Sequence, residues 1–391
     1  MKTQKVIRDP IHGNIGISDS ELSLIDLPEM QRLRNIRQNG LCYLVYPAMN
    51  STRFEHSLGV MHLAGLVSDH LGLDEKKRMS LRAAGLLHDV GHAPFSHTLD
   101  KIFYPGFSHE RTSSRVILDS GVSDLLRQEG LRPKDISDLV LGRSPLSKII
   151  SSEIDVDKMD YLKRDSYYAG VAYGVIDLER IIYSLKMVRK DIVIRENNLE
   201  AVESLLINRN LMYQTVYRHH TKRIAESMFL HAIRSMIERG DVSKSSLASM
   251  DDIELITLLR NSDGYSRDIM ERLDCRLLFK TCLMEKITLF RKDFRERLMD
   301  IEEELENRIS NDYGIPEGHI FVDAPESSLS EFRIRIEQSG SLKRIDKVSL
   351  LARALERSEQ EKLTMGVYVS PQYMKKFKGF KPRRYFKYTR A

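Results

Sequence analysis

Apolar residues recur with a period close to 3.6 along most of the chain, which is the spacing of one face of an α-helix. Residues 22–38 carry apolar side chains at 22, 24, 25, 27, 30, 33 and 36, and the pattern ends before Gly40. It predicts one amphipathic helix there. The same period predicts further helices at residues 54–71, 77–88, 109–118, 122–128, 133–141, 157–168, 199–238 (long or slightly broken) and 292–309. Residues 1–315 are therefore expected to form a mainly α-helical body.

Short stretches with a period of two predict strands. In residues 2–17, Pro10 and Gly13 fit a turn between two extended segments, and residues 185–195 resemble a hairpin. Beyond residue 315 the period changes, because residues 319–322, 332–336 and 365–369 alternate apolar and polar positions around a helix-like stretch at 348–358. We expect residues 316–374 to form a small α+β appendage.

The net charge of +5 is not spread evenly along the chain. Residues 375–391 contain eight Lys or Arg and no acid, so the rest of the chain carries a net charge of −3. Aromatic residues alternate with these bases, a composition that suits single-stranded nucleic acid through stacking and phosphate contacts. We favour a solvated tail whose aromatic rings dock on the body or on a neighbouring subunit, with nucleic-acid binding as a possible secondary property.

Cysteine content and hydropathy indicate the compartment. The three cysteines, Cys42, Cys275 and Cys282, show no CxxC spacing, so neither a disulfide framework nor a cysteine metal site is predicted. No run of about 18 apolar residues and no apolar segment near Met1 is present. We expect a cytoplasmic protein with no membrane partner.

Seven of the twelve histidines stand between residues 56 and 109. His56, the adjacent pair His88 and Asp89, and Asp157 would come from three different helices. Two imidazoles and two carboxylates suit a divalent transition metal, or Mg²⁺ with water in the open positions. Asp89 stands just before Gly91, so it can turn toward the same ion as His88. These four residues are the predicted metal ligands.

Residues around this set could complete a phosphohydrolase site. An open position on the metal would polarise a phosphoryl oxygen or hold an attacking water. Arg53, Lys158 and Arg209 could then clamp phosphate oxygens.

A second group of residues, His92, Asp100 and His109, could move protons. A histidine that a carboxylate orients can give a proton to a leaving oxygen. The alternative for these histidines is a structural role with hydrogen bonds to backbone groups. His97 is expected to be a supporting residue.

These residues resemble the HD-domain phosphohydrolases, whose metal site has the pattern His, His-Asp, Asp. The match is closer to the deoxynucleoside triphosphate (dNTP) triphosphohydrolases, and to the catalytic core of the mammalian SAM-and-HD-domain dNTPase, without a SAM domain. Matching runs stand at residues 5–13, 31–34, 53–60, 88–100 and 154–165, and Arg209 and Tyr217 also match. The HD core would then span about residues 50–170.

The resemblance implies a role for each matched position. Arg53, Lys158 and Arg209 would contact the triphosphate, and Gln38, Tyr161 and Asp165 would hold the sugar. Tyr217 would close against the sugar's 2′ carbon and exclude ribonucleotides. His92, with the pair Asp100 and His109, would assist release of the whole triphosphate from the deoxynucleoside.

A second implied site binds an activating guanine nucleotide at subunit contacts of tetrameric relatives. Its matching residues are Lys5, Val6, Asp26, Gln31 and Arg34. The alternative is an ordinary solvated helix face.

The sequence thus predicts a metal-dependent dNTP triphosphohydrolase that assembles as a homo-oligomer, a tetramer or a dimer. The metal could be Mg, Mn, Fe or Zn. Two alternatives stay open: an HD enzyme that cleaves a nucleoside monophosphate or a cyclic dinucleotide, and an HD protein that senses nucleotides or binds nucleic acid without turnover.

Overall fold

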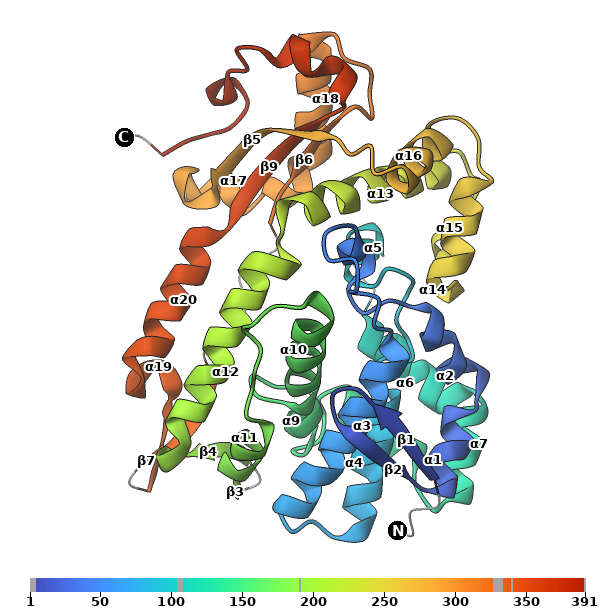
Figure 1. Ribbon diagram of the computed structural model, residues 1–391, viewed down its shortest axis with the longest axis vertical. Helices are drawn as coiled ribbons and strands as arrows, with labels where there is room; N and C mark the ends of the chain where they lie inside the picture. The colour runs from blue at the N-terminus through green and yellow to red at the C-terminus, as the bar shows by residue number, and fades with distance from the viewer. Residues whose placement is uncertain (1–4, 104–107, 190, 326–332, 339, 390–391) are drawn as a thin grey trace. The chain divides into compact units, whose positions relative to one another are not determined.

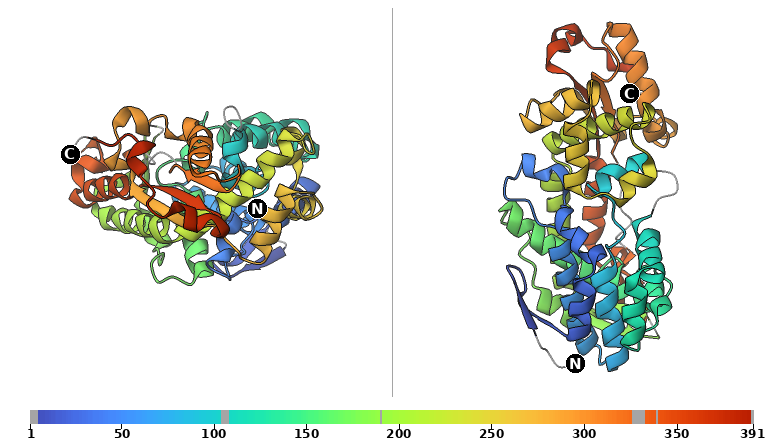
Figure 2. Two further views of the ribbon diagram at one scale, coloured as in Figure 1. Left: turned by 90° about the horizontal axis from the view of Figure 1, so that it is seen from above. Right: turned by 90° about the vertical axis from the view of Figure 1, so that its right-hand side faces the viewer.

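The computed structural model describes residues 5–103, 108–189, 191–325, 333–338 and 340–389 (Figures 1 and 2). The side chain of His97 and residue Arg390 of the basic tail lie outside the described parts. The chain is mainly helical with small sheets, as predicted. It divides into two compact units: unit 1 comprises residues 1–213, 244–255 and 331–353, and unit 2 comprises residues 214–243, 256–330 and 354–391.

Unit 1 is built mainly of helices. They are α1 Asp19–Ile25, α2 Pro28–Arg32, α3 Arg53–His70, α4 Glu75–Leu87, α5 His97–Phe103, α6 His109–Asp119, α7 Gly121–Gln128, α8 Pro133–Val140, α9 Ser147–Ile150, α10 Val156–Ala169, α11 Leu178–Ser184, α12 Leu199–Met212, α14 Lys244–Ser249 and α19 Ile345–Val348. Helices α15 Asp252–Arg260 and α20 Leu350–Lys362 each begin in unit 1 and end in unit 2.

Helix α3 is the centre of unit 1. Its buried residues lie on all its faces, from Phe54 and His56 to Val67, and α4 runs beside it (Figure 1). A helix that is buried all round needs neighbours on every side. Helices α9, α10 and α11 also contact it, and so does the antiparallel hairpin of β1 Lys5–Asp9 and β2 Gly13–Ile17 (Figure 2). His56, the predicted metal ligand on α3, is thus anchored in the core.

Unit 1 also contains a four-stranded sheet in the order β3-β4-β7-β8. Strands β3 Leu185–Val188 and β4 Asp191–Arg195 form the predicted hairpin, and β7 Arg335–Gln338 lies parallel to β4 before turning back as β8 Ser341–Arg344. The strand that was predicted near residues 332–336 therefore does not join the other two predicted strands. Its partner is set by long-range pairing, which local alternation does not encode.

Unit 2 contains a three-stranded antiparallel sheet in the order β5-β9-β6. Its strands are β5 Lys280–Lys286, β6 Ile320–Asp323 and β9 Thr364–Val369, and its helices are α13 His220–Glu238, α16 Tyr265–Asp274, α17 Lys292–Arg295 and α18 Glu302–Tyr313. Helix α18 packs against β6. No helix among the described residues combines the length and the apolar character needed to cross a membrane.

The described part of the basic tail folds onto unit 2. The rings of Phe377, Tyr385 and Phe386 are buried in its core beside Phe290 and Met365. The Tyr385 hydroxyl donates a hydrogen bond to Asp312 at 2.8 Å. These rings are therefore docked on the body, as in the favoured interpretation of the tail, and are not presented for stacking on a nucleobase.

Two predicted helices are broken in the structure. The single helix predicted at 22–38 is wrong, because α1 ends before Leu27, α2 starts at Pro28, and a 3-10 turn follows at Leu33–Asn35. Proline lacks an N–H and disfavours the helical conformation in the residue before it, so it starts a new helix.

The single helix predicted at 292–309 is also wrong. It is divided into α17, a 3-10 turn at Leu298–Ile301 and α18. Phe294, Leu298 and Leu305 all reach the core of unit 2. Their spacing would place them on one face of an unbroken helix too, so the periodicity does not reveal the break.

Candidate metal centre

Three helix ends bring the predicted metal ligands together. The Thr52 side chain caps α3, which places His56 on its first turn, and the Asp155 side chain caps α10, which places Asp157 on its first turn. His88 follows directly after α4. Because α3 contacts both α4 and α10, these three ends meet inside unit 1.

Three of the four side chains lie within reach of one ion, and Asp89 lies beside two of them. Asp157 Oδ1 lies 3.0 Å from His56 Nε2 and 3.9 Å from His88 Nε2. Asp89 lies 3.3 Å from His88 Nε2 through one oxygen and 3.8 Å from His56 Nε2 through the other. His56, His88 and Asp157 form a group that could hold a metal ion.

The hydrogen bonds of the two imidazoles fit metal binding. His56 Nδ1 donates to Asp160 Oδ2 at 2.7 Å, and His88 Nδ1 donates to the carbonyl of Gly85 at 2.8 Å. Their Nε2 atoms are buried and make no hydrogen bond within the described residues. A ligand histidine is typically held in this way, with its other ring nitrogen donating to a carboxylate or carbonyl. The donor set therefore fits a divalent cation.

Electrostatics supports the same conclusion. Burial alone lowers the pKa of His56, but the negative charges of the Asp157 and Asp160 carboxylates beside the ring outweigh burial and raise that pKa to about 10. The carboxylates thus favour a positive charge at this place, which a bound cation would supply in exchange for the proton. Asp157 is 31% exposed, so the site is open to solvent on its side.

A buried network behind His56 was not predicted from the sequence. Asp160 accepts hydrogen bonds from His56, from His12 Nε2 at 2.6 Å and from Arg164 Nη2 at 2.9 Å, and Arg164 Nη1 also donates to Asp9 at 2.8 Å. Asp160 follows Asp157 by three positions and so lies on the same helix face. This spacing is the signal that could have revealed it.

The network requires a glycine where α3 passes α10. A Cβ atom on Gly59 would lie 1.8 Å from Asp160 Oδ1 and 2.7 Å from Arg164 Nη2. Real atoms do not approach so closely, so only glycine admits the Asp160 carboxylate at this place.

Arg53 lies beside the metal group. Its Nη1 donates to Asp89 Oδ2 at 2.5 Å and its Nε donates to Ser96 Oγ at 2.5 Å. Burial raises the pKa of Asp89, but the charge of Arg53 outweighs it and holds that pKa well below its usual value. One side of the guanidinium, Nη2, makes no hydrogen bond within the described residues, and it could still meet a phosphate oxygen.

Two of the predicted proton-transfer residues lie together. The rings of His92 and His109 stack with centroids 4.0 Å apart, and His92 Nε2 lies 3.2 Å from Asp89 Oδ1. Burial and the charge of Arg53 lower the pKa of His92 well below its usual value. His109 also approaches Glu110 at 3.3 Å. Asp100 lies on α5, and its predicted pairing with His109 stays a prediction.

The predicted substrate-binding residues are placed as follows. Gln38, Asp165 and Arg209 are buried, and Tyr161 is partly buried on α10. Lys158 Nζ donates to the carbonyl of Ser152 at 2.8 Å and to Asp155 at 2.9 Å. Tyr217 ends the π-helical segment Tyr213–Tyr217 and belongs to unit 2, so its role at this site stays a prediction.

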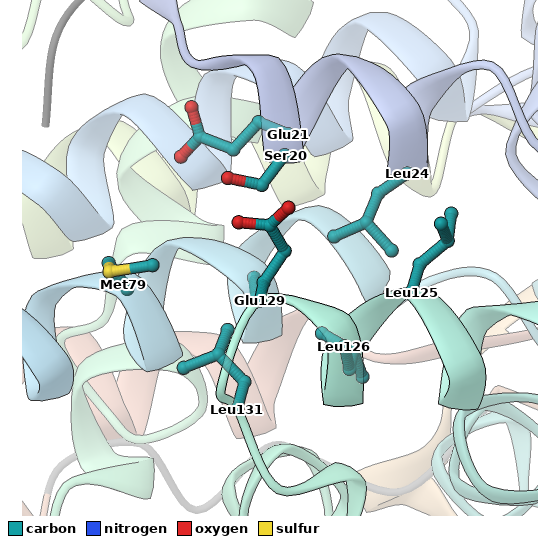
Figure 3. A pocket seen from close by; sticks show the side chains of 9 residues that line it. Ser20, Glu21, Leu24, Met79, Leu125, Leu126, Glu129 and Leu131 are labelled. Atoms are coloured by element: carbon teal, nitrogen blue, oxygen red, sulfur yellow. The ribbon is translucent and has the colours of Figure 1, made fainter.

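The predicted activator residues belong to the surface of unit 1. Lys5, Val6, Asp26 and Arg34 are exposed. Gln31 accepts a hydrogen bond from Arg34 Nε at 2.8 Å, and the Arg34 guanidinium lies 3.6 Å from the centre of the Phe54 ring. A small hollow elsewhere in this unit is lined chiefly by Leu and Met side chains of α1, α4 and α7 and contains none of the metal-binding residues (Figure 3).

Comparisons with known proteins identify two family regions in the chain. The HD domain matches residues 53–165 and the HD associated region matches residues 176–390. The first match begins at Arg53 and ends at Asp165, so it contains all four predicted ligands. The second covers more than half of the chain.

Similar proteins occur in all three domains of life. The uncharacterized protein MJ1154 of Methanocaldococcus jannaschii is 38% identical over 96% of this chain and 81% of its own length. Human deoxynucleoside triphosphate triphosphohydrolase SAMHD1 is 29% identical over 71% of this chain, which spans 55% of that enzyme. A crystal structure of a phosphohydrolase from Bacteroides thetaiotaomicron superposes with a TM-score of 0.77 at 25% identity, covering 94% of this chain and 100% of the other.

Proposed function

Because the chain belongs to the HD phosphohydrolase family and carries the HD-associated region, we propose that it is a metal-dependent dNTP triphosphohydrolase. Its products would be a deoxynucleoside and inorganic triphosphate. The observation that carries the proposal is the convergence of two buried imidazole nitrogens, His56 Nε2 and His88 Nε2, on the carboxylates of Asp157 and Asp89. The similarity to deoxynucleoside triphosphate triphosphohydrolases supports the choice of substrate.

The proposed ligands are His56, His88, Asp89 and Asp157. When bound there, a divalent cation would offset phosphate charge and lower the pKa of a water molecule. The protein's own part is to hold these ligands in place, and the hydrogen bond from His56 to Asp160 does this for the ring that stands at the centre.

Phosphate binding would fall to the cationic side chains. Arg53 already faces Asp89, and its Nη2 could donate to a phosphate oxygen. Lys158 would have to leave Ser152 and Asp155 to reach the triphosphate, whereas Arg209 is fixed by burial. A buried arginine keeps its charge and can bind phosphate through two parallel hydrogen bonds.

Proton transfer and sugar selection complete the proposal. His92, with the pair Asp100 and His109, would assist proton transfer to the leaving oxygen, and the rings of His92 and His109 stack. Gln38, Tyr161 and Asp165 would hold the sugar. Tyr217 would leave no room for a 2′-hydroxyl.

We also propose activation by a guanine nucleotide in a homo-oligomer. Lys5, Val6, Asp26, Gln31 and Arg34 would form that site. The exposure of all but the partly buried Gln31 on unit 1 leaves them accessible to a nucleotide.

Product analysis tests the proposed function. Each dNTP is incubated with the purified protein and Mg²⁺ or Mn²⁺, with and without GTP, and the products are separated by ion-exchange chromatography. Deoxynucleoside with intact triphosphate is the expected result, and a GTP requirement would support the activator site. Formation of a deoxynucleoside monophosphate with pyrophosphate would refute the proposal and direct the search to the other HD activities.

Matched variants identify the site. His56→Ala should abolish turnover, whereas His70→Ala should not, because His70 ends the same helix and its Nε2 bonds to the carbonyl of Leu185 instead. Equal turnover by wild type and His56→Ala would refute the proposed metal centre.

A further inference from the structure

The turn that joins α14 to α15 contacts the loop that follows the predicted metal ligands His88 and Asp89. Residues 244–255 are flanked in the sequence by segments of unit 2, yet they fold with unit 1. Two adjacent aspartates stand at this turn, and they make different contacts.

Asp251 caps α15, and its Oδ2 also accepts a hydrogen bond from Asn35 Nδ2 at 2.8 Å, outside the segment from His92 to Ser96. Its Oδ1 accepts a hydrogen bond from the backbone N–H of Glu254 at 2.9 Å, and Glu254 accepts one from the N–H of Asp251 at 2.9 Å. This reciprocal pair satisfies the free N–H groups at the start of a helix. The start of α15 therefore does not need Asp252 as a cap.

Asp252 instead reaches across unit 1. One of its oxygens accepts the backbone N–H of Phe95 at 2.8 Å and the other accepts the N–H of Arg37 at 3.0 Å. The side chain is fully buried, and burial raises its pKa to about 6. Keeping this carboxylate charged at neutral pH costs the fold free energy, as expected of a group placed for its geometry.

The loop that Asp252 holds has an unusual backbone. Phe95 and Ser96 have φ values of 49° and 35°, in the left-handed region that residues other than glycine rarely adopt. Such conformations persist only where the surroundings hold them. The hydrogen bond to the N–H of Phe95 acts on the strained residue itself.

Arg32 ties the same turn to the same loop. Its guanidinium donates to the carbonyls of Ser249 at 3.0 Å and Met250 at 2.6 Å, and also to the carbonyl of His92 at 2.8 Å. Arg32 and Asp252 therefore hold the segment from His92 to Ser96 at two points, the carbonyl of His92 and the N–H of Phe95.

That segment contacts the metal group directly. Ser96 Oγ accepts from Arg53 Nε, and Arg53 Nη1 donates to Asp89, each at 2.5 Å. His92 Nε2 lies 3.2 Å from the other oxygen of Asp89. Both groups that orient the Asp89 carboxylate thus depend on the conformation of this segment.

We propose that Asp252 and Arg32 are positioning residues, which hold the segment from His92 to Ser96 so that Ser96, Arg53 and His92 fix Asp89 for metal binding. This inference rests on the proposed role of Asp89 as a ligand. Neither positioning residue would touch the metal or the substrate.

The test is Mn²⁺ binding by the metal-free full chain, measured by isothermal titration calorimetry without nucleotide. We expect Asp252→Ala and Ser96→Ala each to weaken binding about tenfold, in the range typical of residues that orient metal ligands. The double variant should be no weaker than Asp252→Ala alone, because both residues act through one chain of contacts. Asp251→Ala is the matched control, and it should lower the melting temperature while leaving Mn²⁺ affinity unchanged.

Three results would overturn the inference: wild-type affinity in Asp252→Ala, effects of Asp252 and Ser96 that multiply, or an equal loss of affinity in Asp251→Ala. If Asp252→Ala does not fold, Asp252→Asn replaces it. Its single amide oxygen can accept only one of the two N–H groups, so we expect a smaller loss of affinity, and no loss would refute the proposal. A wild-type chain that binds Mn²⁺ but hydrolyses no dNTP would refute the proposed function alone.

Discussion

Replacing Gly59 by alanine should destabilise the protein, although alanine is the better helix former. The new methyl group would overlap Asp160 Oδ1, at 1.8 Å, and approach Arg164 Nη2, at 2.7 Å. Moving the Asp160 side chain costs free energy, because it accepts hydrogen bonds from His56, His12 and Arg164 and is fully buried. To make room, the carboxylate must leave these partners.

The magnitude follows from two opposing terms. Gly to Ala in a helix interior contributes about 1 kcal/mol in favour of the variant. Breaking a buried charged pair costs about 3–5 kcal/mol. The net loss is therefore about 2–4 kcal/mol, which lowers the melting temperature by roughly 5–15 °C for a compact unit of this size.

Thermal unfolding of the metal-free protein, followed by circular dichroism, measures this loss. Gly121→Ala is the matched control, because a Cβ on Gly121, at the start of α7, would make only an ordinary contact of 3.7 Å with Leu27. That variant should melt at or above the wild-type temperature. If Gly59→Ala melts as high as Gly121→Ala, the close approach of α3 and α10 does not set the position of Asp160, and the reasoning is refuted.

Four further predictions concern the site and its regulation. Asp157→Ala should abolish Mn²⁺ binding and turnover, because Asp157 lies 3.0 Å from His56; unchanged turnover by chromatography would place the metal elsewhere. Tyr217→Ala should admit ribonucleotides by leaving room for a 2′-hydroxyl, and continued failure to hydrolyse ATP or CTP would assign the gate to another residue. Arg34→Ala should abolish stimulation by GTP without changing Mn²⁺ affinity, so persistent stimulation would exclude the predicted activator site. Although burial raises it, the charge of Arg164 holds the pKa of Asp160 well below its usual value, so the metal-free protein should lose stability as the pH falls below about 4. Asp160→Asn should reduce that loss in urea titrations between pH 5 and 3, and an identical pH dependence would show that other carboxylates cause it.

The helices near the site could be predicted from the sequence because each has its own period and boundary. Helix α3 begins after Thr52 and α10 after Asp155, and both caps are visible in the chain. Prediction failed where periodicity continues through a break, as at Pro28. It also failed where tertiary pairing decides, since nothing local to residues 335–338 indicates that β7 lies beside β4.

The same distinction applies to the site. The structure brings together His56, His88, Asp89 and Asp157, whose residue types and order carry the family resemblance. Asp160 and Asp252 were not predicted, because a buried charge is explained by its partners, and His12, His56 and Phe95 lie far from these aspartates in the sequence.

The interleaving of the two units constrains how the protein can be made. Ile194 of β4 pairs with Ile336 of β7, so unit 1 lacks a central strand of its sheet until the ribosome has passed residue 338. Much of unit 2 is synthesised between β4 and β7, so the two units must complete folding together rather than one after the other. Pairing between such distant segments also slows folding. A recombinant fragment that stops at residue 213 would leave the edge of β4 open, and an open edge invites pairing with other chains. Expression of the whole chain is thus the route to soluble unit 1.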